Sequence, residues 1–362
     1  MPRSPGSLRS LLAWLRPPPR LVDWSIFTLV LLAAGSGFLS FLGMRPAWIP
    51  VFWFHRTVGL TLIVLLGFKL ARVRSRLTNR EQWRASTALS VLTALAAVGT
   101  IGTGIVWVFG YTPEVPVFTF LSVHVGFGIL LVVVMFAHMK TRFRLPRRVD
   151  FDRRRTTLQF SALLVFGAVT YRVQELLNTL FGTPGTERRL TGSRREAGSG
   201  NGSFPVTSWV ADDPEPVATE EYRLTVRGAV NEPLALAYAD LDPDGETTAL
   251  LDCTSGWYTK QAWRGVSVGS VLDRVGPTAE ATHVRFVSVT GYRWSLPIEE
   301  ARGALLATHV GDERLSHGHG APVRLVAPGR RGFQWVKWVT RVEVRTQGDP
   351  AQWLVTLISG FE

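Results

Sequence analysis

The chain has 362 residues, with 40 Lys and Arg against 28 Asp and Glu, a formal net charge of +12 and one cysteine. Residues 1–199 carry 25 basic and 8 acidic side chains, whereas residues 200–362 carry 15 and 20. The basic residues stand between long apolar runs rather than on a polar face, so we exclude nucleic acid as the partner and expect a membrane segment followed by a domain in water. A single thiol also excludes an internal disulfide.

Five segments of the first half are long and apolar enough to cross a bilayer, which needs about 20 helical residues. They are 24–43, 51–71, 86–110, 117–139 and 157–181. The first follows a basic, proline-rich tail over 1–22 and is too long and poorly terminated for a cleaved signal peptide. We therefore predict an all-α membrane bundle of five transmembrane helices, with a four-helix domain over 23–155 and a fifth helix over 156–181.

Lys and Arg gather in the loops 72–84 and 140–155, whereas the other two loops carry only Arg45 and Glu114 as charges. Short basic loops stay in the cytoplasm. The N-terminus is therefore predicted to be cytoplasmic, and everything after about residue 182 is predicted to lie outside the cell membrane. The expected protein is multi-pass, with membrane lipid as one partner.

The fifth span begins with RRRTTLQFSALLVFGAV, in which Arg154 and Arg155 precede a moderately apolar helix. This arrangement resembles a twin-arginine export signal, which moves domains that are already folded. The alternative is that both arginines only anchor the helix at the cytoplasmic surface. The residues leave both interpretations open.

Three of the seven histidines, His55, His124 and His138, lie within or at the ends of predicted spans. Ionisable groups inside a membrane are costly, so each histidine is a functional candidate. His55 and His124 lie near the outer ends of two spans that run in the same direction, so their imidazoles can meet at similar depth. Two imidazoles from different helices suit axial ligation of haem iron. We predict a b-type haem between His55 and His124.

A second haem is predicted nearer the inner surface. His138 follows His124 by 14 residues, which returns to nearly the same helix face about 21 Å deeper. The matching position on the second span is Lys69, which would act as a neutral amine ligand or contact a haem propionate. The alternative is that Lys69 and His138 only reach toward the polar membrane surface.

The segments FHRTVGLTLIVLLGFKL and SVHVGFGILLVVVMFAHMK resemble the small membrane cytochrome b domains found beside, or fused to, molybdopterin oxidoreductases. The resemblance covers about 45–155. It implies electron transport through haem.

Residues 182–203 are rich in Gly, Ser and Arg and lack a hydrophobic period, so we expect a flexible linker. From Phe204 to residue 362, short alternating runs predict β-strands in YRLTVRGAV, HVRFVSVTGYRWSLP, PVRLVAP and VTRVEV. Helices are expected at about 267–275 and 298–306. The sequence therefore predicts an α+β domain with one core.

The only cysteine, Cys253, lies in LLDCTSGWYTKQAW, close to Trp257 and Tyr258. An exposed thiol outside the cell invites oxidation, so Cys253 is either buried and inert or chemically used. A thiolate can ligate a metal or act as a nucleophile. Four histidines are candidate bases for the second role: His283, His309, His317 and His319. The residues alone leave all three interpretations open.

Two blocks, LDCTSGW…WRGVSVGSVL and HGHGAPVRLVAPGRRGFQWVKWVTRVEV, resemble the molybdopterin-binding fold of the sulfite oxidase family over about 204–345. In that family a cysteine thiolate ligates molybdenum. The resemblance implies this role for Cys253, with Trp257 and Tyr258 in the catalytic pocket. The family's His-Gly-x-Pro-x-Arg and Val-Lys-Trp elements imply that three residues hold the pterin and its phosphate, namely His319, Arg324 and Lys337.

The residue types also suit a phosphate on chemical grounds, because an arginine fork and a lysine point charge both bind one. Gly329 and Gly332 flank Arg330, which we predict to contribute to the cofactor site. Asn201 falls where the family has an upstream pterin and substrate segment. The alternative for Arg324 is an outward-facing charge on a strand.

Departures from the family pattern argue against sulfite as the substrate. Thr254, Ser255 and Gly256 follow Cys253, where sulfite oxidases have arginines that bind the sulfite anion, and no C-terminal dimerisation domain is expected. The pattern is closer to the bacterial periplasmic branch, which includes a reductase of methionine sulfoxide.

We therefore predict a membrane-anchored molybdopterin-dependent oxidoreductase that transfers oxygen atoms outside the cell membrane, on a small-molecule or protein-bound oxidised substrate. Electrons would pass through b-type haem to or from quinone or another redox partner. The alternative is a membrane cytochrome b whose outer domain binds or senses a ligand without catalysis, with Cys253 as a core residue.

Overall fold

The computed structural model describes residues 17–79, 81, 83, 85–113, 119–142, 144–150, 153–208 and 212–358. The chain divides into two compact units, Met1–Gly192 and Ser193–Glu362. Most of the predicted N-terminal tail lies outside the described residues, as do Arg80, Arg84 and Glu114 of the predicted loops. Each unit is described by itself.

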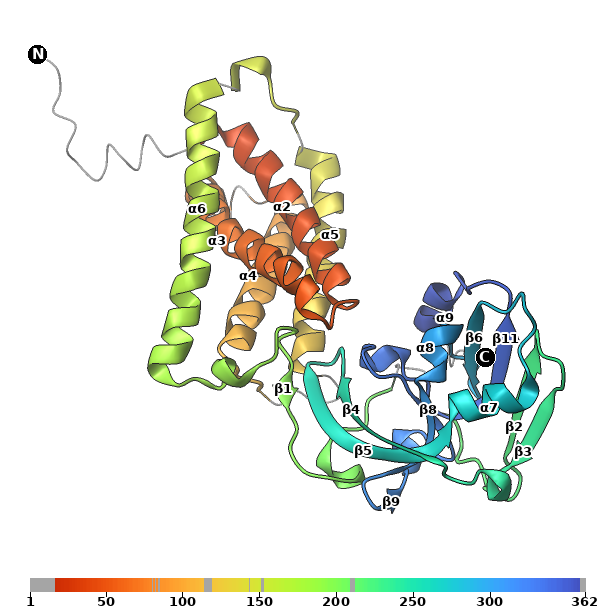
Figure 1. Ribbon diagram of the computed structural model, residues 1–362. Helices are drawn as coiled ribbons and strands as arrows, with labels where there is room; N and C mark the ends of the chain where they lie inside the picture. The colour runs from red at the N-terminus through yellow and green to blue at the C-terminus, as the bar shows by residue number, and fades with distance from the viewer. Residues whose placement is uncertain are drawn as a thin grey trace, which may run out of the picture. The chain divides into compact units, whose positions relative to one another are not determined.

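The membrane unit consists of long helices connected by short segments (Figure 1). Their bounds are α2 Pro19–Ser40, α3 Ile49–Thr78, α4 Ala85–Val108, α5 Phe120–Arg142 and α6 Arg153–Phe181. Among the described residues, these five helices are long and apolar enough to cross a membrane, which confirms that each predicted span is a long apolar helix. Proline stands in the first turn of α2 and α3, where its missing N–H leaves no helical hydrogen bond unmade.

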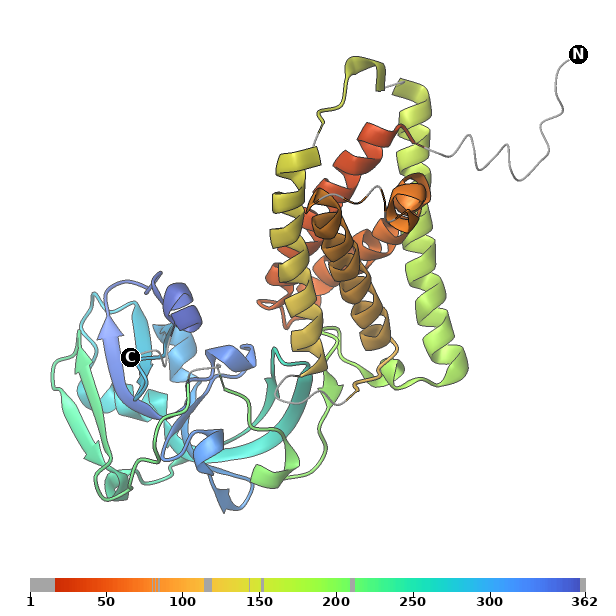
Figure 2. The ribbon, with the colours of Figure 1, turned by 180° about the vertical axis from the view of Figure 1, so that it is seen from behind.

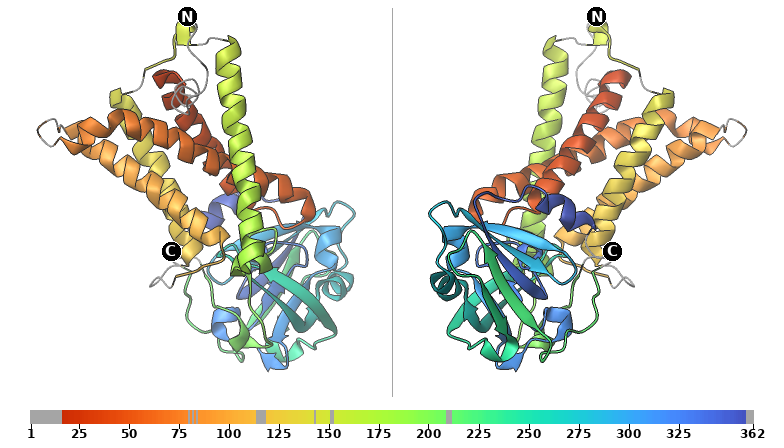
Figure 3. Two further views of the ribbon diagram at one scale, coloured as in Figure 1. Left: turned by 90° about the vertical axis from the view of Figure 1, so that its left-hand side faces the viewer. Right: turned by 90° about the vertical axis from the view of Figure 1, so that its right-hand side faces the viewer.

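The helices of the membrane unit pack in pairs. α2 packs along α3 and α4 along α5, and both pairs can be followed from behind in Figure 2. The long α6, light green in Figure 3, packs on α3. A small buried cluster joins the pairs through Val30, Leu62, Ala96 and Leu131. Apolar side chains on the outer faces stay exposed, such as Leu95 at 61%, as expected of helices that face lipid.

The C-terminal unit contains two β-sheets. Within the described residues, one sheet has six strands in the order β1-β5-β8-β10, with β4 paired to β5 and β9 to β8. Its strands are β1 Arg194–Arg195, β4 Gly245–Asp252, β5 Trp257–Ser267, β8 Leu305–Val310, β9 Glu313–Arg314 and β10 Arg324–Val326. The other sheet has five strands in the order β3-β2-β11-β6-β7. Its strands are β2 Arg223–Gly228, β3 Leu234–Ala237, β6 His283–Ser288, β7 Arg293–Pro297 and β11 Val339–Arg345.

Short helices complete the α+β core, and their bounds are α7 Val268–Val275, α8 Ile298–Arg302 and α9 Gln352–Ile358. In α7, the Ser267 side chain accepts a hydrogen bond from the Ser270 N–H, and Gly276 ends the helix with a positive φ of 60°. Residues at helical spacing on α7 are buried in the core: Val268, Val271, Leu272 and Val275. The structure confirms the predicted fold class, an α-helical membrane part followed by an α+β domain.

Two expectations need correction. The predicted helix at 298–306 ends at Arg302, and the chain continues as strand β8 from Leu305. The predicted flexible linker over 182–203 is also wrong in its second half, because β1 pairs in parallel with β5 and Ser193 is fully buried. The low apolar content of this segment did not exclude packing, since its backbone pairs with β5 and the Ser193 hydroxyl donates to Asp252. The four predicted strand segments are confirmed as β2, β6 with β7, β10 and β11.

Candidate active site and candidate haem site

Cys253 lies in the tight turn between β4 and β5. Its N–H donates to the Trp257 carbonyl at 2.8 Å, and its own carbonyl accepts from the Gly256 N–H at 3.2 Å. Gly256 has a φ of +94°, a conformation that favours glycine and lets the turn close. The thiol is free and only 7% of the residue is exposed. The turn therefore holds the one sulfhydryl group of the chain in a fixed, protected position.

Aromatic side chains surround the cysteine turn. The Trp257 indole N–H donates to the Thr207 hydroxyl at 3.2 Å, and Phe204 lies 5.7 Å from the Trp257 ring and 4.3 Å from the His319 ring. Tyr258 is the next residue of β5, so its side chain leaves the opposite face of the strand from Trp257. Phe204 therefore lies against both the Trp257 ring and the His319 ring, whereas the catalytic roles of Trp257 and Tyr258 stay predictions.

The structure brings the three predicted pterin-binding residues together near Cys253. Arg324 is buried between two indoles, with its guanidinium carbon 5.6 Å from the ring of Trp263 and 5.8 Å from that of Trp335. It donates to the His319 carbonyl at 3.0 Å. Both indoles belong to the same buried cluster as Cys253, and a negative charge on the Cys253 sulfur raises the pKa of both Arg324 and Lys337. Arg324 is therefore not an outward-facing charge.

Burial shifts the pKa values of Arg324, Lys337 and His319. It lowers the pKa of Arg324 to about 10 and, together with the Arg324 charge, lowers that of Lys337 to about 7. Burial and the same guanidinium lower the pKa of His319 to about 4, so its imidazole is neutral near pH 7. The His319 Nε2–H then donates to the Phe204 carbonyl at 3.2 Å, while Nδ1 accepts from the Ser316 hydroxyl at 2.8 Å.

These residues fit an anionic, phosphate-bearing cofactor. Arg324 Nε is buried and has no hydrogen-bond partner within the described part of the chain, so the guanidinium keeps donor capacity for an anion. Lys337 Nζ donates to the carbonyls of Gly318 and Thr207 at 2.6 and 2.8 Å. It also donates to the Ser208 hydroxyl at 3.1 Å.

Two other predicted cofactor residues, Arg330 and Asn201, also bind protein groups, and a contact of Arg330 with the cofactor stays a prediction. Arg330 forms a two-pronged ion pair with Glu300, with both distances at 2.5 Å. Asn201 binds Glu313 and the Arg314 carbonyl through its amide nitrogen, at 2.9 and 2.8 Å, and accepts from the Ser316 N–H at 2.9 Å. Asn201 therefore holds the loop that leads to His319 by hydrogen bonds. Its direct contact with a cofactor stays a prediction.

The sequence did not distinguish Arg331 from its neighbour Arg330. The structure places Arg331, 3% exposed, against the cysteine turn, where it donates to the Asp252 carboxylate at 2.6 Å and to the Cys253 carbonyl at 3.3 Å. Two adjacent arginines in a glycine-flanked loop give no sequence signal for which one turns inward. Asp252, the acidic residue next to Cys253, was the only sequence feature that suggested a buried arginine partner near the cysteine.

A comparison with protein families assigns the region that contains these residues to a known domain family. Residues 211–353 match the oxidoreductase molybdopterin binding domain family. This region is a molybdopterin-binding oxidoreductase domain. The match contains Cys253, Arg324 and Lys337, and it confirms the predicted sulfite oxidase-like family for the C-terminal part of the chain.

Individual relatives are similar over the same region. The chain is 28% identical over 156 residues to the uncharacterized oxidoreductase YuiH of Bacillus subtilis (strain 168), which covers 42% of this chain and 78% of that protein. It is 28% identical over 152 residues to the protein-methionine-sulfoxide reductase catalytic subunit MsrP of Burkholderia mallei (strain ATCC 23344), covering 36% and 46%. The chain thus spans about half the length of that relative. Among solved structures, the sulfane dehydrogenase SoxCD from Paracoccus pantotrophus matches with 28% identity and a TM-score of 0.35, covering 37% of this chain and 40% of that chain.

The membrane unit, outside the molybdopterin-binding domain, brings the imidazole rings of His55 and His124 close together. Their ring centroids lie 6.3 Å apart, with an angle of 85° between the rings. Nδ1 of His55 donates to the Ala33 carbonyl at 2.9 Å, and Nδ1 of His124 donates to the Thr100 carbonyl at 2.9 Å. This fixes the proton on Nδ1 and leaves each Nε2 with the lone pair that a metal requires.

The two histidines fit an iron between them. A metal–imidazole bond is about 2.0 Å and the nitrogen lies about 1.1 Å from its ring centre, so two imidazoles in line with one ion have centroids about 6.2 Å apart. The observed 6.3 Å matches this spacing. Hydroxyls of Ser36 and Thr103 lie 3.2 and 3.1 Å from the Nδ1 atoms, and the next residue in each case is a glycine against the ring. The same local arrangement thus occurs in both helix pairs.

Lys69 and His138, the predicted ligands of a second haem, do not share the arrangement found around His55 and His124. Lys69 Nζ lies 2.6 Å from the Asp23 carboxylate, which also accepts from Arg72 at 2.6 Å. His138 Nδ1 lies 3.5 Å from the Ser90 hydroxyl. The Asp23 pairing accounts for Lys69 without a metal, so ligation of a second haem by Lys69 and His138 stays a prediction.

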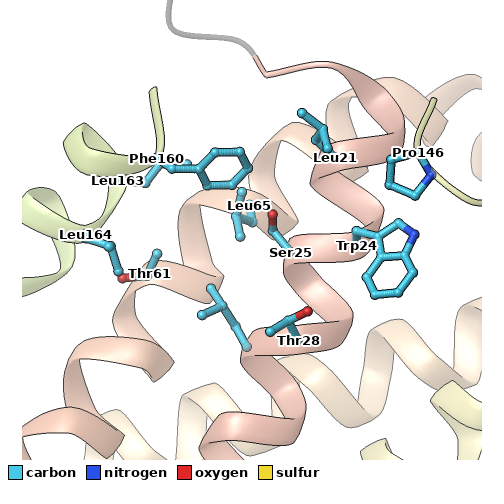
Figure 4. Close-up of a pocket in the computed structure, with 11 residues that line it drawn as sticks. Leu21, Trp24, Ser25, Thr28, Thr61, Leu65, Pro146, Phe160, Leu163 and Leu164 are labelled. Carbon is cyan, nitrogen blue, oxygen red and sulfur yellow. The ribbon is translucent and has the colours of Figure 1, made fainter. Parts of the chain in front are cut away.

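A pocket of about 630 Å³ lies between α2, α3 and α6 (Figure 4). Its walls are mostly apolar, with the hydroxyls of Ser25, Thr28 and Thr61 among them. Thr61 is buried and donates to the Thr57 carbonyl at 2.8 Å. The pocket therefore combines an apolar lining with a few polar groups, as small-molecule sites do.

Proposed function

We propose that this protein is a membrane-anchored molybdopterin-dependent oxidoreductase that transfers an oxygen atom to or from its substrate and exchanges electrons with the membrane through a b-type haem. The proposal is carried by the position of Cys253, the only cysteine, in the same molybdopterin-binding domain as the buried Arg324 and the half-buried Lys337. The domain is placed outside the cell membrane because the basic loops between the spans are assigned to the cytoplasm.

Each residue of the site has a distinct role in this proposal. When bound, the molybdenum cofactor supplies the two-electron oxygen-atom-transfer chemistry. Cys253 provides the thiolate ligand, and the closed turn holds its sulfur in place. Arg324 and Lys337 bind the anionic part of the pterin, while neutral His319 offers hydrogen bonds but no charge. The aromatic side chains of Phe204 and Trp257 keep water away from this side of the cysteine.

We favour a sulfoxide as the substrate. The relatives include several protein-methionine-sulfoxide reductase catalytic subunits, and the residues that follow Cys253 are small and uncharged. A neutral sulfoxide needs no arginine for binding, whereas the sulfite anion does. Trp257 gives the apolar contact that the carbon substituents of a sulfoxide require.

Electrons are proposed to pass through a haem held by His55 and His124. A haem accepts one electron at a time, so it divides a two-electron reaction into single steps. A lipid-soluble quinone is the natural partner within a membrane, and we assign its ring to the pocket between α2, α3 and α6. Ser25 and Thr28 offer hydroxyls to quinone oxygens there.

A metal and optical inventory of the purified full chain tests the proposal. We expect one molybdenum and at least one haem per chain from cells that make the cofactor. Cys253→Ser should abolish turnover and leave the haem spectrum unchanged, and His124→Ala should remove the signal of the haem proposed between His55 and His124. Molybdenum well below one per chain in wild-type protein would overturn the proposal and favour a membrane cytochrome with a ligand-binding domain.

A further inference from the structure

A buried ionic network lies behind the cysteine turn. Arg331 joins Asp252 and the Cys253 carbonyl, and the Ser193 hydroxyl donates to the same Asp252 oxygen at 2.7 Å. Asp252 is fully buried and Arg331 is 3% exposed. The three residues come from distant parts of the sequence: the segment before β1, the end of β4 and the loop after β10.

The network contacts the backbone of Cys253 itself. The Cys253 carbonyl accepts from both the Gly256 N–H within the turn and Arg331 from outside it. Gly332 packs so closely that an added Cβ would lie 3.1 Å from the Cys253 Cα. Asp252 also forms a parallel bridge with Arg331, so backbone and side chain hold the same two segments together. The position of the cysteine, and hence of its sulfur, depends on this loop.

A buried ion pair joins two loops at a high cost in desolvation free energy. Desolvation of both charges often cancels their attraction, and apolar residues of similar size can stabilise a fold as well. A buried pair is better suited to fixing one arrangement, because each charge tolerates few other partners. Here the arrangement that is fixed contains the chain's only thiol.

We propose that Arg331 is a positioning residue for Cys253: through Asp252 and the Cys253 carbonyl, it sets the direction in which the sulfur meets the metal. This inference rests on the proposed role of Cys253 as the molybdenum ligand. In this proposal Arg331 acts on the sulfur only through Asp252 and the backbone of Cys253. Its neighbour Arg330 is a matched control, because it pairs with Glu300 instead.

The first test uses the full chain without molybdenum cofactor and measures alkylation of its single cysteine by iodoacetamide. Arg331→Met should open the turn and raise the labelling rate of native protein about tenfold, which corresponds to about 1.4 kcal/mol in the opening equilibrium. Arg331→Lys should restore part of the protection, and Arg330→Met should leave the rate unchanged. Equal rates in Arg331→Met, Arg330→Met and wild type would overturn the proposal.

The second test uses the cofactor-loaded protein and a spectroscopic readout. Arg331→Lys should change the Mo(V) electron paramagnetic resonance spectrum while the molybdenum content stays near one per chain. Asp252→Asn, which keeps the shape of the acid, should change it in the same sense. Spectra identical to wild type in both variants would contradict a positioning role even if Arg331→Met fails to fold. Absence of molybdenum from wild type would overturn the proposed function, whereas the labelling result would still report on the turn.

Discussion

A methyl group on Gly104 would lie 3.0 Å from Cε1 of His124, tighter than most contacts of a real Cβ. Gly104→Ala should therefore press on the proposed axial ligand and weaken haem binding by about 1–3 kcal/mol, the usual cost of overpacking. We expect lower haem content and a shifted Soret band in the purified protein. Gly102→Ala is the control in the same helix, because an added Cβ there meets nothing within 4 Å. Equal haem spectra in the two variants would count against His124 as a ligand.

The partner histidine has the same relationship with Gly37, where an added Cβ would lie 3.0 Å from Cε1 of His55. If the two helix pairs hold one haem between them, Gly37→Ala should reproduce the effect of Gly104→Ala on the spectrum. Gly35→Ala provides the control, since nothing lies within 4 Å of its Cβ. An effect of only one of the two glycine substitutions would indicate that the two histidines do not share an iron.

Arg324 is expected to bind the cofactor through several N–H donors of its planar guanidinium and not through its charge alone. Arg324→Lys keeps the charge but removes the planar set of donors, including the Nε–H that has no partner among the described residues. One hydrogen bond to a charged group is worth about 1.5–3 kcal/mol, so pterin affinity should fall about tenfold or more. Molybdenum per chain measures this, with the half-exposed Arg341→Gln as a control. Full molybdenum occupancy in Arg324→Lys would refute the assignment.

The membrane helices and the cysteine motif were accessible from the sequence for physical reasons. A lipid-facing helix needs about 20 apolar residues, which leaves a long and unmistakable pattern. A lone cysteine beside Trp257 is rare enough to stand out. The pairing of His55 with His124 needed only their similar depth on two helices, and the structure brings them together.

Other parts of the site depend on contacts that the sequence does not record. Whether Arg330 or Arg331 turns inward is decided by Glu300 on one side and Asp252 on the other. Ser193 was missed because a polar segment with few apolar residues can still pair its backbone with a strand such as β5. Asp23, 46 residues before Lys69, accepts a hydrogen bond from it, a pairing that the sequence does not reveal, and Lys69 as a haem ligand stays a prediction.

His319 should make the cofactor-free domain sensitive to acid. Burial and Arg324 lower its pKa to about 4, against 6.5 in the unfolded chain. The unfolded state therefore binds more protons between about pH 6.5 and 4, so this contribution to the free energy of unfolding is lost as the pH falls through that window. The full effect of such a shift is about 3 kcal/mol. His319→Gln, which does not titrate, should flatten the dependence in denaturation curves followed by near-ultraviolet circular dichroism. An unchanged slope would show that His319 is not the group responsible.

The pocket between α2, α3 and α6 gives a test of the electron donor. Ser25→Phe should obstruct the part of the pocket beside α2 and slow reduction of the haem by a short-chain quinol about tenfold or more, because a ring-sized ligand no longer fits beside the Ser25 position. The haem spectrum and its reduction by dithionite should stay normal, since Ser25 is not a proposed ligand. Leu95→Phe places the same ring on an exposed face of α4 and should leave the quinol rate unchanged. Equal quinol rates in Ser25→Phe, Leu95→Phe and wild type would show that the pocket holds lipid chains instead and that quinol reaches the haem elsewhere.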